Sequence, residues 1–442
     1  LGVSAPLRQL PAPTPAPKAL EGWIPATSHR PAWEALGVRA IDDFTLEAQL
    51  ERPIPFFLEL TQFPMMAPIR EDVVVKWATP SERADAARQK KPYLLWVSSA
   101  WWRPKKIVTN GPYTLTDWAM NDRFVFEKNP HYWDSAAVKL EKVVSITSDD
   151  THAMLNLYKG GLLDYPGTNT AIPPDFVLPI SKKKDYVNAA YLGTYFYWIN
   201  VHADPVKNIA VRRALNMSIN KKAICENVMR GGQKPATALV PPGTGQGYQP
   251  PEGDPYDVLR AKQILAEAGF PGGKGLPKIT LLYNTEEGHR KIAEAIHQMW
   301  KVDLGIDVDI ENQEWKVFNK NLENGFYQIG RMGWIGDYND PFTFLSILLS
   351  TSDQNNAKWK NKMFDDLLDK AARERDLTKR YDLYREAEKV ILRELPVLPI
   401  YTYRRQSLVR PYVRGWAPNI LDIHLYKDLW IEPGPKTSPI PG

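Results

Sequence analysis

Lys278-Ile-Thr-Leu-Leu-Tyr283 opens the stretch of the sequence that decides the fold class. This apolar run predicts a buried strand. Arg290–Leu304 follows with helical periodicity, and Ile306-Asp-Val-Asp-Ile310 then alternates apolar and polar residues as a second strand does. A strand, a helix and a strand in this order predict a crossover between parallel strands. We therefore predict an α/β fold.

Strands elsewhere in the chain predict antiparallel pairing as well. Tyr113–Trp118 and Arg123–Lys128 flank the turn residues Met120-Asn-Asp122 and predict a hairpin. Apolar and polar residues alternate from Phe44 to Leu50, and Val397–Tyr403 is a further apolar run. The predicted structure therefore combines parallel and antiparallel strands.

Helical periodicity predicts most of the remaining framework. One helix is expected over Val206–Met229. Another is expected to begin at Asp254, whose side chain can cap it with Pro255 in the first turn, and to end at Gly269. The stretch Pro11–Pro17 is Pro-rich and is expected to be extended. Two further helices are predicted near Lys362–Arg375 and Leu377–Leu395.

The composition limits the class of protein. With 442 residues, the chain can form two or three lobes that each have a core. Its 56 Lys and Arg nearly balance 51 Asp and Glu, without a long basic run, so nucleic-acid binding is not expected. No stretch reaches the roughly 20 apolar residues that cross a bilayer. The chain begins Leu1-Gly-Val3 with no recognisable export signal, as a cleaved or partial N-terminus would.

The sequence offers no pattern for a metal, a cofactor or a catalytic nucleophile. Its seven histidines are scattered, and His289 and His297 lack a third ligand at metal-binding spacing. A Gly-x-Ser-x-Gly motif is missing, and the single cysteine, Cys225, is expected to be a small buried apolar residue. The glycine-rich runs lack phosphate-loop spacing. We therefore predict that the protein is not an enzyme and carries no metal or cofactor.

Gly333-Trp-Ile-Gly-Asp-Tyr-Asn-Asp-Pro341 is the most unusual segment. Asp340 before Pro341 predicts a helix start, which gives this carboxylate a structural role. Asp337 has no such explanation. It could form a turn by bonding its own backbone, or it could hold a cation of a ligand through a charge-assisted hydrogen bond of about 1.5–3 kcal/mol. The residues alone leave both interpretations open.

Four separated stretches resemble the peptide-binding branch of the family 5 bacterial solute-binding proteins, the periplasmic oligopeptide-binding proteins of ABC importers. They follow the family's order over nearly the whole chain, which makes the match specific. The stretches are Val108–Trp118 with Asn129–Trp133; Gly193–Asn200 with Val211–Leu215 and Ile219-Asn-Lys; Tyr283-Asn-Thr with His289 and Asn312–Lys316; and the Gly333–Pro341 segment.

The resemblance implies the type II periplasmic-binding fold, with two main lobes joined by a hinge and a truncated accessory lobe. Residues 1–108 would be the remnant of the accessory lobe, residues 109–197 with 411–442 would be main lobe I, and residues 198–410 would be main lobe II, which carries most of the peptide site. The implied function is the extracytoplasmic capture of short peptides for the membrane permease of an ABC importer. The implied protein is a periplasmic or cell-surface monomer.

The resemblance also implies where a peptide would bind. Asp337 matches the acidic residue that receives the peptide's α-amino group, and the backbone of Gly333–Ile335 would pair with the peptide main chain. His289 and Arg331 match positions that help to receive the carboxylate. From the residues alone, His289 would instead be a helix-face residue and Arg331 a solvated surface cation.

Aromatic side chains complete the implied site. Trp315 and Trp334 would wall side-chain pockets, and Phe196 and Trp198 would face the ligand. From the residues alone, Trp315 would be a core residue, and the aromatic strand around Phe196 fits a buried sheet equally well.

The chain departs from the family at several positions. Gly193 and Ile335 stand where members often have cysteines, and Trp198 stands where an acidic side chain is common. Members also have a longer N-terminal region before the segment that starts at Leu36, so we expect the sequence to be partial. The open alternatives are the same fold with another solute, namely an oligosaccharide, an opine or a metal chelate, and a truncated remnant with impaired binding.

Overall fold

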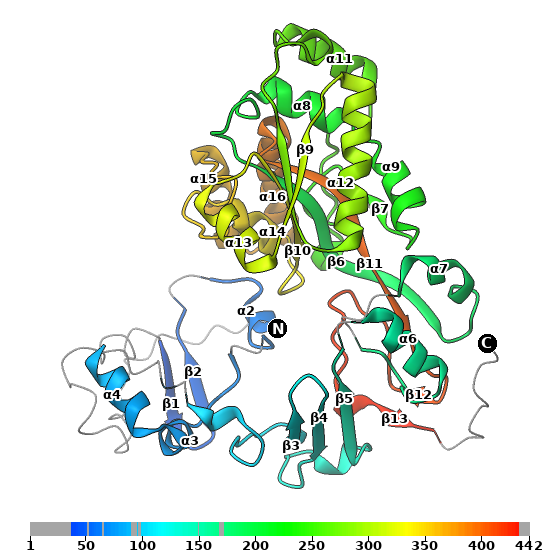
Figure 1. Ribbon diagram of the computed structural model, residues 1–442. Coiled ribbons are helices and arrows are strands. Elements are labelled where there is room, and N and C mark those ends of the chain that lie inside the picture. Colours follow the sequence, from blue (N-terminus) through cyan, green and yellow to red (C-terminus); the bar gives the residue numbers. More distant parts are fainter. Residues whose placement is uncertain are drawn as a thin grey trace. The chain divides into compact units, whose positions relative to one another are not determined.

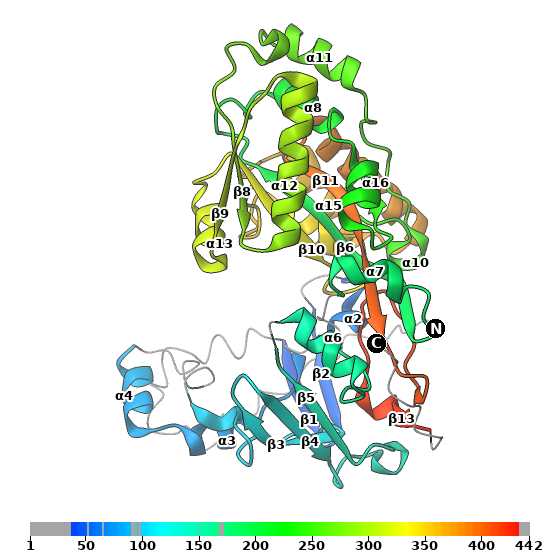
Figure 2. The same cartoon turned by 45° about the vertical axis from the view of Figure 1, so that its right-hand side comes forward.

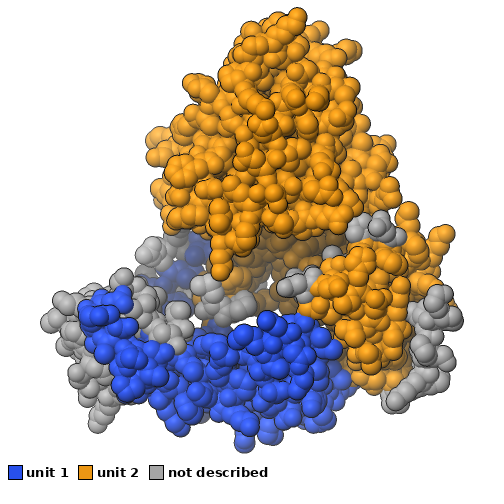
Figure 3. Space-filling view, viewed as in Figure 1, with its two compact units in different colours: residues 1–54, 67–147 blue, residues 55–66, 148–442 orange. Residues whose placement is uncertain are grey.

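The computed structural model describes residues 37–50, 53–63, 66–89, 95, 99–148, 150–167 and 172–432. The Pro-rich stretch at 11–17 lies outside them. The chain forms two compact units: unit 1 comprises residues 1–54 and 67–147, and unit 2 comprises residues 55–66 and 148–442 (Figure 3). The lobe boundaries at 108, 197 and 410 come from the family resemblance and stay a prediction.

Unit 1 contains two small antiparallel sheets. β1 (Val38–Asp42) pairs with β2 (Thr45–Ala48), and a second sheet has the order β3-β4-β5. The predicted hairpin is confirmed, with Asn121 in the left-handed conformation (φ 59°) at its turn. Among the described residues, this unit also contains β3 (Tyr113–Ala119), β4 (Arg123–Lys128), β5 (Lys142–Ile146), α3 (Glu71–Trp77), α4 (Pro80–Arg88) and the 3-10 turns Ala100–Trp102 and Ser135–Ala137.

The predicted crossover in unit 2 is confirmed. β8 (Thr280–Asn284) pairs in parallel with β9 (Asp309–Gln313), and α12 (Glu287–Met299) connects them (Figure 1). The second strand begins three residues later than predicted. The predicted end of the helix at Leu304 is confirmed, because α12 continues into a π-helical turn (Trp300–Leu304) that ends at Gly305 in a left-handed conformation.

Six strands form the central sheet of unit 2, in the order β7-β11-β6-β10-β8-β9. β6 (Tyr186–Ile199) and β11 (Val397–Leu408) are antiparallel partners, and β10 (Ile329–Ile335) lies antiparallel on the other side of β6. β7 (Lys234–Pro235) is a short strand at one edge. The apolar strand predicted at Val397–Tyr403 is confirmed as the first part of β11.

The helix predicted over Val206–Met229 is interrupted. α8 (Ile209–Met217) ends, and a new helical start at Asn220, whose side chain caps the next turn, opens α9 (Lys221–Ala223) and a π-helical turn (Ile224–Met229). The apolar period continues through this break, which is why periodicity alone did not predict it.

The helix α11 (Val258–Glu267) begins at a different aspartate from the predicted one. Asp257 caps it by accepting the Arg260 N–H at 2.9 Å. Asp254 instead accepts the Arg213 Nε–H at 3.0 Å, in an ion pair with α8. Both aspartates can cap a helix, so a partner that is distant in the sequence decides between them.

The last two predicted helices are confirmed as α15 (Lys362–Arg373) and α16 (Leu377–Glu394). Among the described residues, none of the helices is both long and apolar enough to cross a bilayer. Unit 2 also contains α2 (Phe57–Leu60), α6 (Thr151–Lys159), α7 (Pro174–Ile180), α10 (Thr244–Gly247), α13 (Trp315–Asn324), α14 (Phe342–Leu345), β12 (Val413–Arg414), β13 (Trp430–Ile431) and the 3-10 turns Pro271–Gly273, Ser346–Leu348 and Tyr426–Asp428.

Two hydrophobic cores cover the two faces of the central sheet. Alternate residues of β6 belong to different cores, as the two-residue period of a strand requires. Tyr195 and Tyr197 pack with residues of α8, α11 and α12, whereas Phe196 and Trp198 pack with residues of α13 to α16. Figures 1 and 2 show these helices around the central sheet. Cys225 is buried in the first core, as predicted. β10 lies next to β6 and carries the candidate site, so the site is supported by a hydrophobic core on each face of the sheet.

Candidate functional site

β10 presents an open strand edge over most of its length. One edge of β10 pairs with β6 along the whole strand. The opposite edge pairs with β8 only at Ile329 and Gly330, and no strand among the described residues pairs with it over residues 331–335. Such an edge carries backbone N–H and C=O groups that an extended chain can bind. The residues predicted to pair with a peptide backbone, Gly333–Ile335, lie on this edge.

Asp337 follows the open edge and has an available carboxylate. Its side chain is exposed, and it has no hydrogen-bond or ion-pair partner within the described part of the chain. The alternative of a turn in which Asp337 bonds its own backbone lacks the required hydrogen bond. The backbone N–H of Asp337 instead donates to Thr343 Oγ1 at 3.3 Å. Partial desolvation raises the pKa of the Asp337 carboxyl.

Asp340 has a structural role, as predicted. Its Oδ1 accepts the Phe342 N–H at 2.9 Å where α14 begins. Its Oδ2 lies 3.1 Å from the Arg380 guanidinium of α16, and both side chains are almost fully buried. Arg380 is far away in the sequence, so no local pattern predicts this pair. The pair fixes the end of the loop that carries Asp337 against the core.

Arg331 and His289 meet around Tyr195, at the other end of β10. The Arg331 guanidinium lies 4.6 Å from the centroid of the Tyr195 ring, and the centroid of the His289 ring lies 5.5 Å from it. Arg331 also donates to the Tyr403 hydroxyl at 3.0 Å and to Asn284 Oδ1 at 3.2 Å. Its Nε is enclosed by protein, so Arg331 is not the solvated surface cation of the alternative interpretation.

A carboxylate that the sequence did not single out holds His289. The His289 Nδ1 lies 2.9 Å from Glu286, whose side chain also accepts the Gly288 and His289 backbone N–H groups as the cap of α12. Burial lowers the pKa of His289, and the charge of Arg331 adds to this lowering, although Glu286 opposes it. Desolvation of Glu286 is outweighed by these hydrogen bonds and by the charge of His289, so its pKa falls to about 2.

Opposite charges therefore stand at the two ends of the open edge. Arg331 and Asp337 are six positions apart, which corresponds to about 20 Å between their Cα atoms in an extended chain at roughly 3.3 Å per residue. Between them lie backbone groups without a strand partner. This arrangement is complementary to an extended chain with a positive amino end and a negative carboxyl end.

Two glycines, one on β10 and one on its partner strand β6, allow close packing around the candidate site. A Cβ at Gly333 would come within 2.5 Å of the Tyr403 hydroxyl oxygen, which accepts the hydrogen bond from Arg331. A Cβ at Gly193, which lies opposite Ile335 in the ladder, would clash with the Ile335 side chain and approach Tyr403 to 2.9 Å. Gly193 and Ile335, for which the resemblance led us to expect cysteines in other members, are thus cross-strand neighbours, and here an isoleucine packs on a glycine.

The aromatic residues of the predicted site have different environments. Trp315 begins α13 and is 47% exposed, with its ring centroid 6.0 Å from that of Phe318, so it is not a core residue. Trp334 is half-buried. Phe196 and Trp198 are completely buried in the core, where they make a perpendicular ring contact at 5.0 Å. They are packing residues in this structure, and their expected contact with a ligand stays a prediction.

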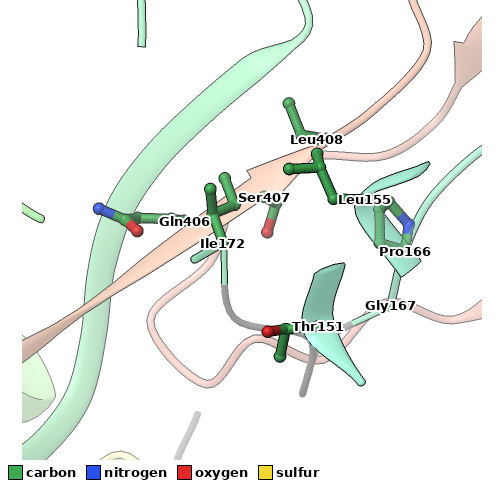
Figure 4. Close-up of a pocket in the computed structure, with 8 residues that line it drawn as sticks. All are labelled: Thr151, Leu155, Pro166, Gly167, Ile172, Gln406, Ser407 and Leu408. Carbon is green, nitrogen blue, oxygen red and sulfur yellow. The ribbon is translucent and has the colours of Figure 1, made fainter. Parts of the chain in front are cut away.

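A separate pocket is lined by residues of α6 and β11 and by Pro166, Gly167 and Ile172 (Figure 4). No residue of the predicted site lines it. The lining residues of the pocket are Thr151, Leu155, Pro166, Gly167, Ile172, Gln406, Ser407 and Leu408.

Among the described residues, no group of three or more His, Cys, Asp or Glu side chains could hold a metal ion.

Known proteins resemble this chain over most of its length. Residues 21–356 match the middle region of the bacterial extracellular solute-binding proteins, family 5. The oligopeptide-binding protein OppA of Bacillus subtilis is 36% identical over 393 residues, which cover 87% of this chain and 68% of that protein. The periplasmic oligopeptide-binding protein OppA of Salmonella typhimurium is 35% identical over 406 residues, 90% of this chain and 70% of that one. The solved structure of the Escherichia coli murein tripeptide-binding protein MppA matches with a TM-score of 0.76 at 32% identity, covering 90% of this chain and 75% of that one.

Proposed function

This chain belongs to the bacterial extracellular solute-binding proteins of family 5, and we propose that it captures short peptides and delivers them to an ABC importer. Its fold is the type II periplasmic-binding fold of that family. The observation that carries the proposal is the open edge of β10. The available carboxylate of Asp337 stands at one end of this edge, and the side chains of Arg331 and His289 stand at the other.

An extended peptide would add to β10 as a further strand. Its backbone groups would bind those of Gly333–Ile335, and its α-ammonium would bind the Asp337 carboxylate. Its carboxylate would lie near Arg331 and His289, either in direct contact or through a bridging water. Because backbone groups are common to all peptides, a site of this kind accepts many sequences.

Chemically matched peptides test the proposal. A peptide of about six residues with free ends, which in extended form can span the distance between the two charges, should raise the melting temperature of the purified protein, because a ligand that binds the native state stabilises it. Acetylating the amino group should remove most of this rise, because the acetylated nitrogen carries no charge for Asp337. Amidating the carboxyl end should have a smaller effect.

The identity of any bound solute gives an independent check. Native mass spectrometry of freshly purified protein should reveal peptides that dissociate on activation. An oligosaccharide, an opine or a metal chelate in their place would contradict the proposal, as would the failure of every peptide pool to raise the melting temperature.

Other parts of the proposal rest on the family rather than on the site. They are a periplasmic or cell-surface location, a monomeric state, a membrane permease as partner and a binding rather than a catalytic role. The division into main lobes I and II, with a hinge near residues 197 and 410, belongs to the same group. Peptide-dependent uptake that requires both this protein and a permease would support the transport role.

A further inference from the structure

The segment that contains α2 is folded with unit 2, although the chain on both sides of it belongs to unit 1. Residues 55–66 cluster with unit 2, whereas the chain up to residue 54 and from residue 67 to 147 clusters with unit 1. Within this segment, Phe56 and Glu59 contact the loop that carries Asp337. We call these two residues the clasp.

Phe56 is the aromatic part of the clasp. Its ring stacks on Tyr338 with a centroid distance of 4.5 Å and an interplanar angle of 10°, and it also lies 5.4 Å from the ring of Phe342. Stacked rings hold their partners in a defined orientation. Because Tyr338 directly follows Asp337, Phe56 fixes the residue next to the available carboxylate.

Glu59 is the polar part of the clasp. Its Oε2 accepts the backbone N–H of Asn339 at 2.8 Å. The side chain of Asn339 turns to another element, where its Oδ1 accepts the Gly245 N–H at 2.8 Å. The loop is therefore held by α10 and by the Asp340–Arg380 pair, and the clasp adds contacts to the two residues that follow Asp337.

We propose that the clasp positions Asp337 for the α-ammonium of the peptide, so that clasp docking and peptide binding favour one another. This inference rests on the proposed function. No bond within the described residues restrains the Asp337 carboxylate itself, so its direction depends on the backbone that Phe56 and Glu59 hold. Because coupling between two binding events is reciprocal, a peptide bound at Asp337 also stabilises the docked clasp. Glu59 acts as a hydrogen-bond acceptor, since its bond is to a backbone N–H.

Calorimetric titration with the same free peptide tests the proposal. Phe56→Ala should weaken binding by roughly 5- to 20-fold, within the range of typical coupling between sites. Phe56→Tyr keeps the ring and should retain most of this affinity. Glu59→Gln keeps an acceptor oxygen and should likewise retain most of the affinity that Glu59→Ala loses. Leu58→Ala is the matched control, because Leu58 is 78% exposed on the same helix.

A double-mutant cycle separates positioning from a general structural role. In an Asp337→Asn background, Phe56→Ala should cause little further loss of affinity, because the charge that the clasp positions has gone. Saturating peptide should slow amide hydrogen exchange at residues 57–60 in the wild type but not in Asp337→Asn. If Phe56→Ala does not fold, as judged by its melting transition, the Glu59→Ala and Glu59→Gln pair carries the same cycle.

Three outcomes would overturn the inference. The first is wild-type affinity in both Phe56→Ala and Glu59→Ala. The second is an equal loss with and without the Asp337 carboxylate, which would indicate a structural role only. The third is an equal loss in Glu59→Gln and Glu59→Ala, which would make Glu59 a charge for the ligand. A wild-type protein that binds no peptide would overturn the proposed function itself, and the clasp with it.

Discussion

The two ends of the open edge of β10 are built in opposite ways. At one end, the Asp337 carboxylate is exposed and has no partner within the described residues. At the other, Arg331 and His289 already have protein partners, among them Tyr403 and Asn284. A charge without a partner gains a complete ion pair when a ligand arrives, whereas a charge with partners exchanges or shares its bonds. The amino end of a peptide should therefore be recognised more strictly than its carboxyl end.

Asp337→Asn should have the largest effect on binding. The variant leaves the α-ammonium of a bound peptide without a countercharge, and the loss of one partner from a pair that the bound peptide buries costs about 3–5 kcal/mol. We expect the affinity for a free peptide to fall by more than about 100-fold in calorimetric titrations. The melting temperature without peptide should hardly change, because the carboxylate has no partner to lose. An affinity close to that of the wild type would remove Asp337 from the amino end.

Arg331→Met should have a smaller effect on binding and a larger effect on stability. The affinity should fall by about 10-fold, since other groups remain near the peptide carboxylate. The melting temperature should also fall, because Tyr403 and Asn284 each lose a hydrogen-bond partner at a cost of about 1–3 kcal/mol. Thermal unfolding and titration of the same sample measure both quantities. An unchanged melting temperature would mean that the two ends do not differ in how firmly the protein holds their charges.

Acidification should act on the two ends in opposite directions. The pKa of Asp337 is raised, so its carboxylate takes up a proton at a higher pH than an ordinary aspartate does and the amino end weakens. The pKa of His289 is lowered, so its imidazole is neutral at pH 7 and gains charge only in acid, which strengthens the attraction for a carboxylate. The affinity of a carboxyl-amidated peptide should therefore fall more steeply below pH 6 than that of a free peptide.

The lowered pKa of His289 also makes the stability of the folded protein depend on pH in this range. Because its folded-state pKa lies below the unfolded value, the unfolded chain takes up a proton first as the pH falls below 6.5. Stability without peptide is therefore lost on acidification through this window, and His289→Gln should remove that contribution to the pH dependence of the melting temperature. A steeper profile in His289→Gln would mean that His289 stabilises the folded protein in acid, the opposite of this expectation.

The substitution Glu388→Gln should have the smallest effect on binding. It serves as the reference for the dependence of stability on pH. The fully buried Glu388 carboxylate of α16 accepts the Leu239 and Val240 N–H groups, each at 2.8 Å, and the Tyr248 hydroxyl at 2.9 Å. Burial raises its pKa to about 7. Between about pH 4.5 and 7, the native state therefore holds more protons than the unfolded chain, and stability falls as the pH rises.

Glu388→Gln should flatten this part of the stability profile and leave the peptide affinity unchanged. Thermal unfolding between pH 4.5 and 7.5 measures the first effect, and titration at pH 7 measures the second. A change in affinity would show that the core beneath the site, and not only its two ends, sets the pH dependence of binding.

Local patterns in the sequence were sufficient for the framework of unit 2. The crossover from β8 to β9 follows from short apolar runs and one helical period, which need no knowledge of distant contacts. The incorrect helix predictions fall where the local sequence is compatible with two structures equally well. The apolar period continues across the break at Asn220, and Asp254 can cap a helix as well as Asp257, until Arg213 binds it. A partner from another element decides such cases.

The candidate site divides in the same manner. Asp337 could be singled out from the sequence because no local role explained it, whereas the roles of Arg331 and His289 came from the family resemblance and stay predictions. Their meeting around Tyr195 joins residues of β10, α12 and β6, and no local pattern contains it. Glu59 had no signal at all, because its bond to Asn339 joins segments far apart in the chain.

The packing of Ile335 on Gly193 has a consequence for how the protein can be made. Within this chain, the one cysteine is buried and no second thiol exists for it to join. The contact between β6 and β10 is therefore held by backbone hydrogen bonds and side-chain packing, and a reductant has no covalent link to break there. We therefore expect this chain to have the same melting curve whether it is folded in a reducing cytoplasm or in an oxidising compartment. The addition of a thiol should not change that curve.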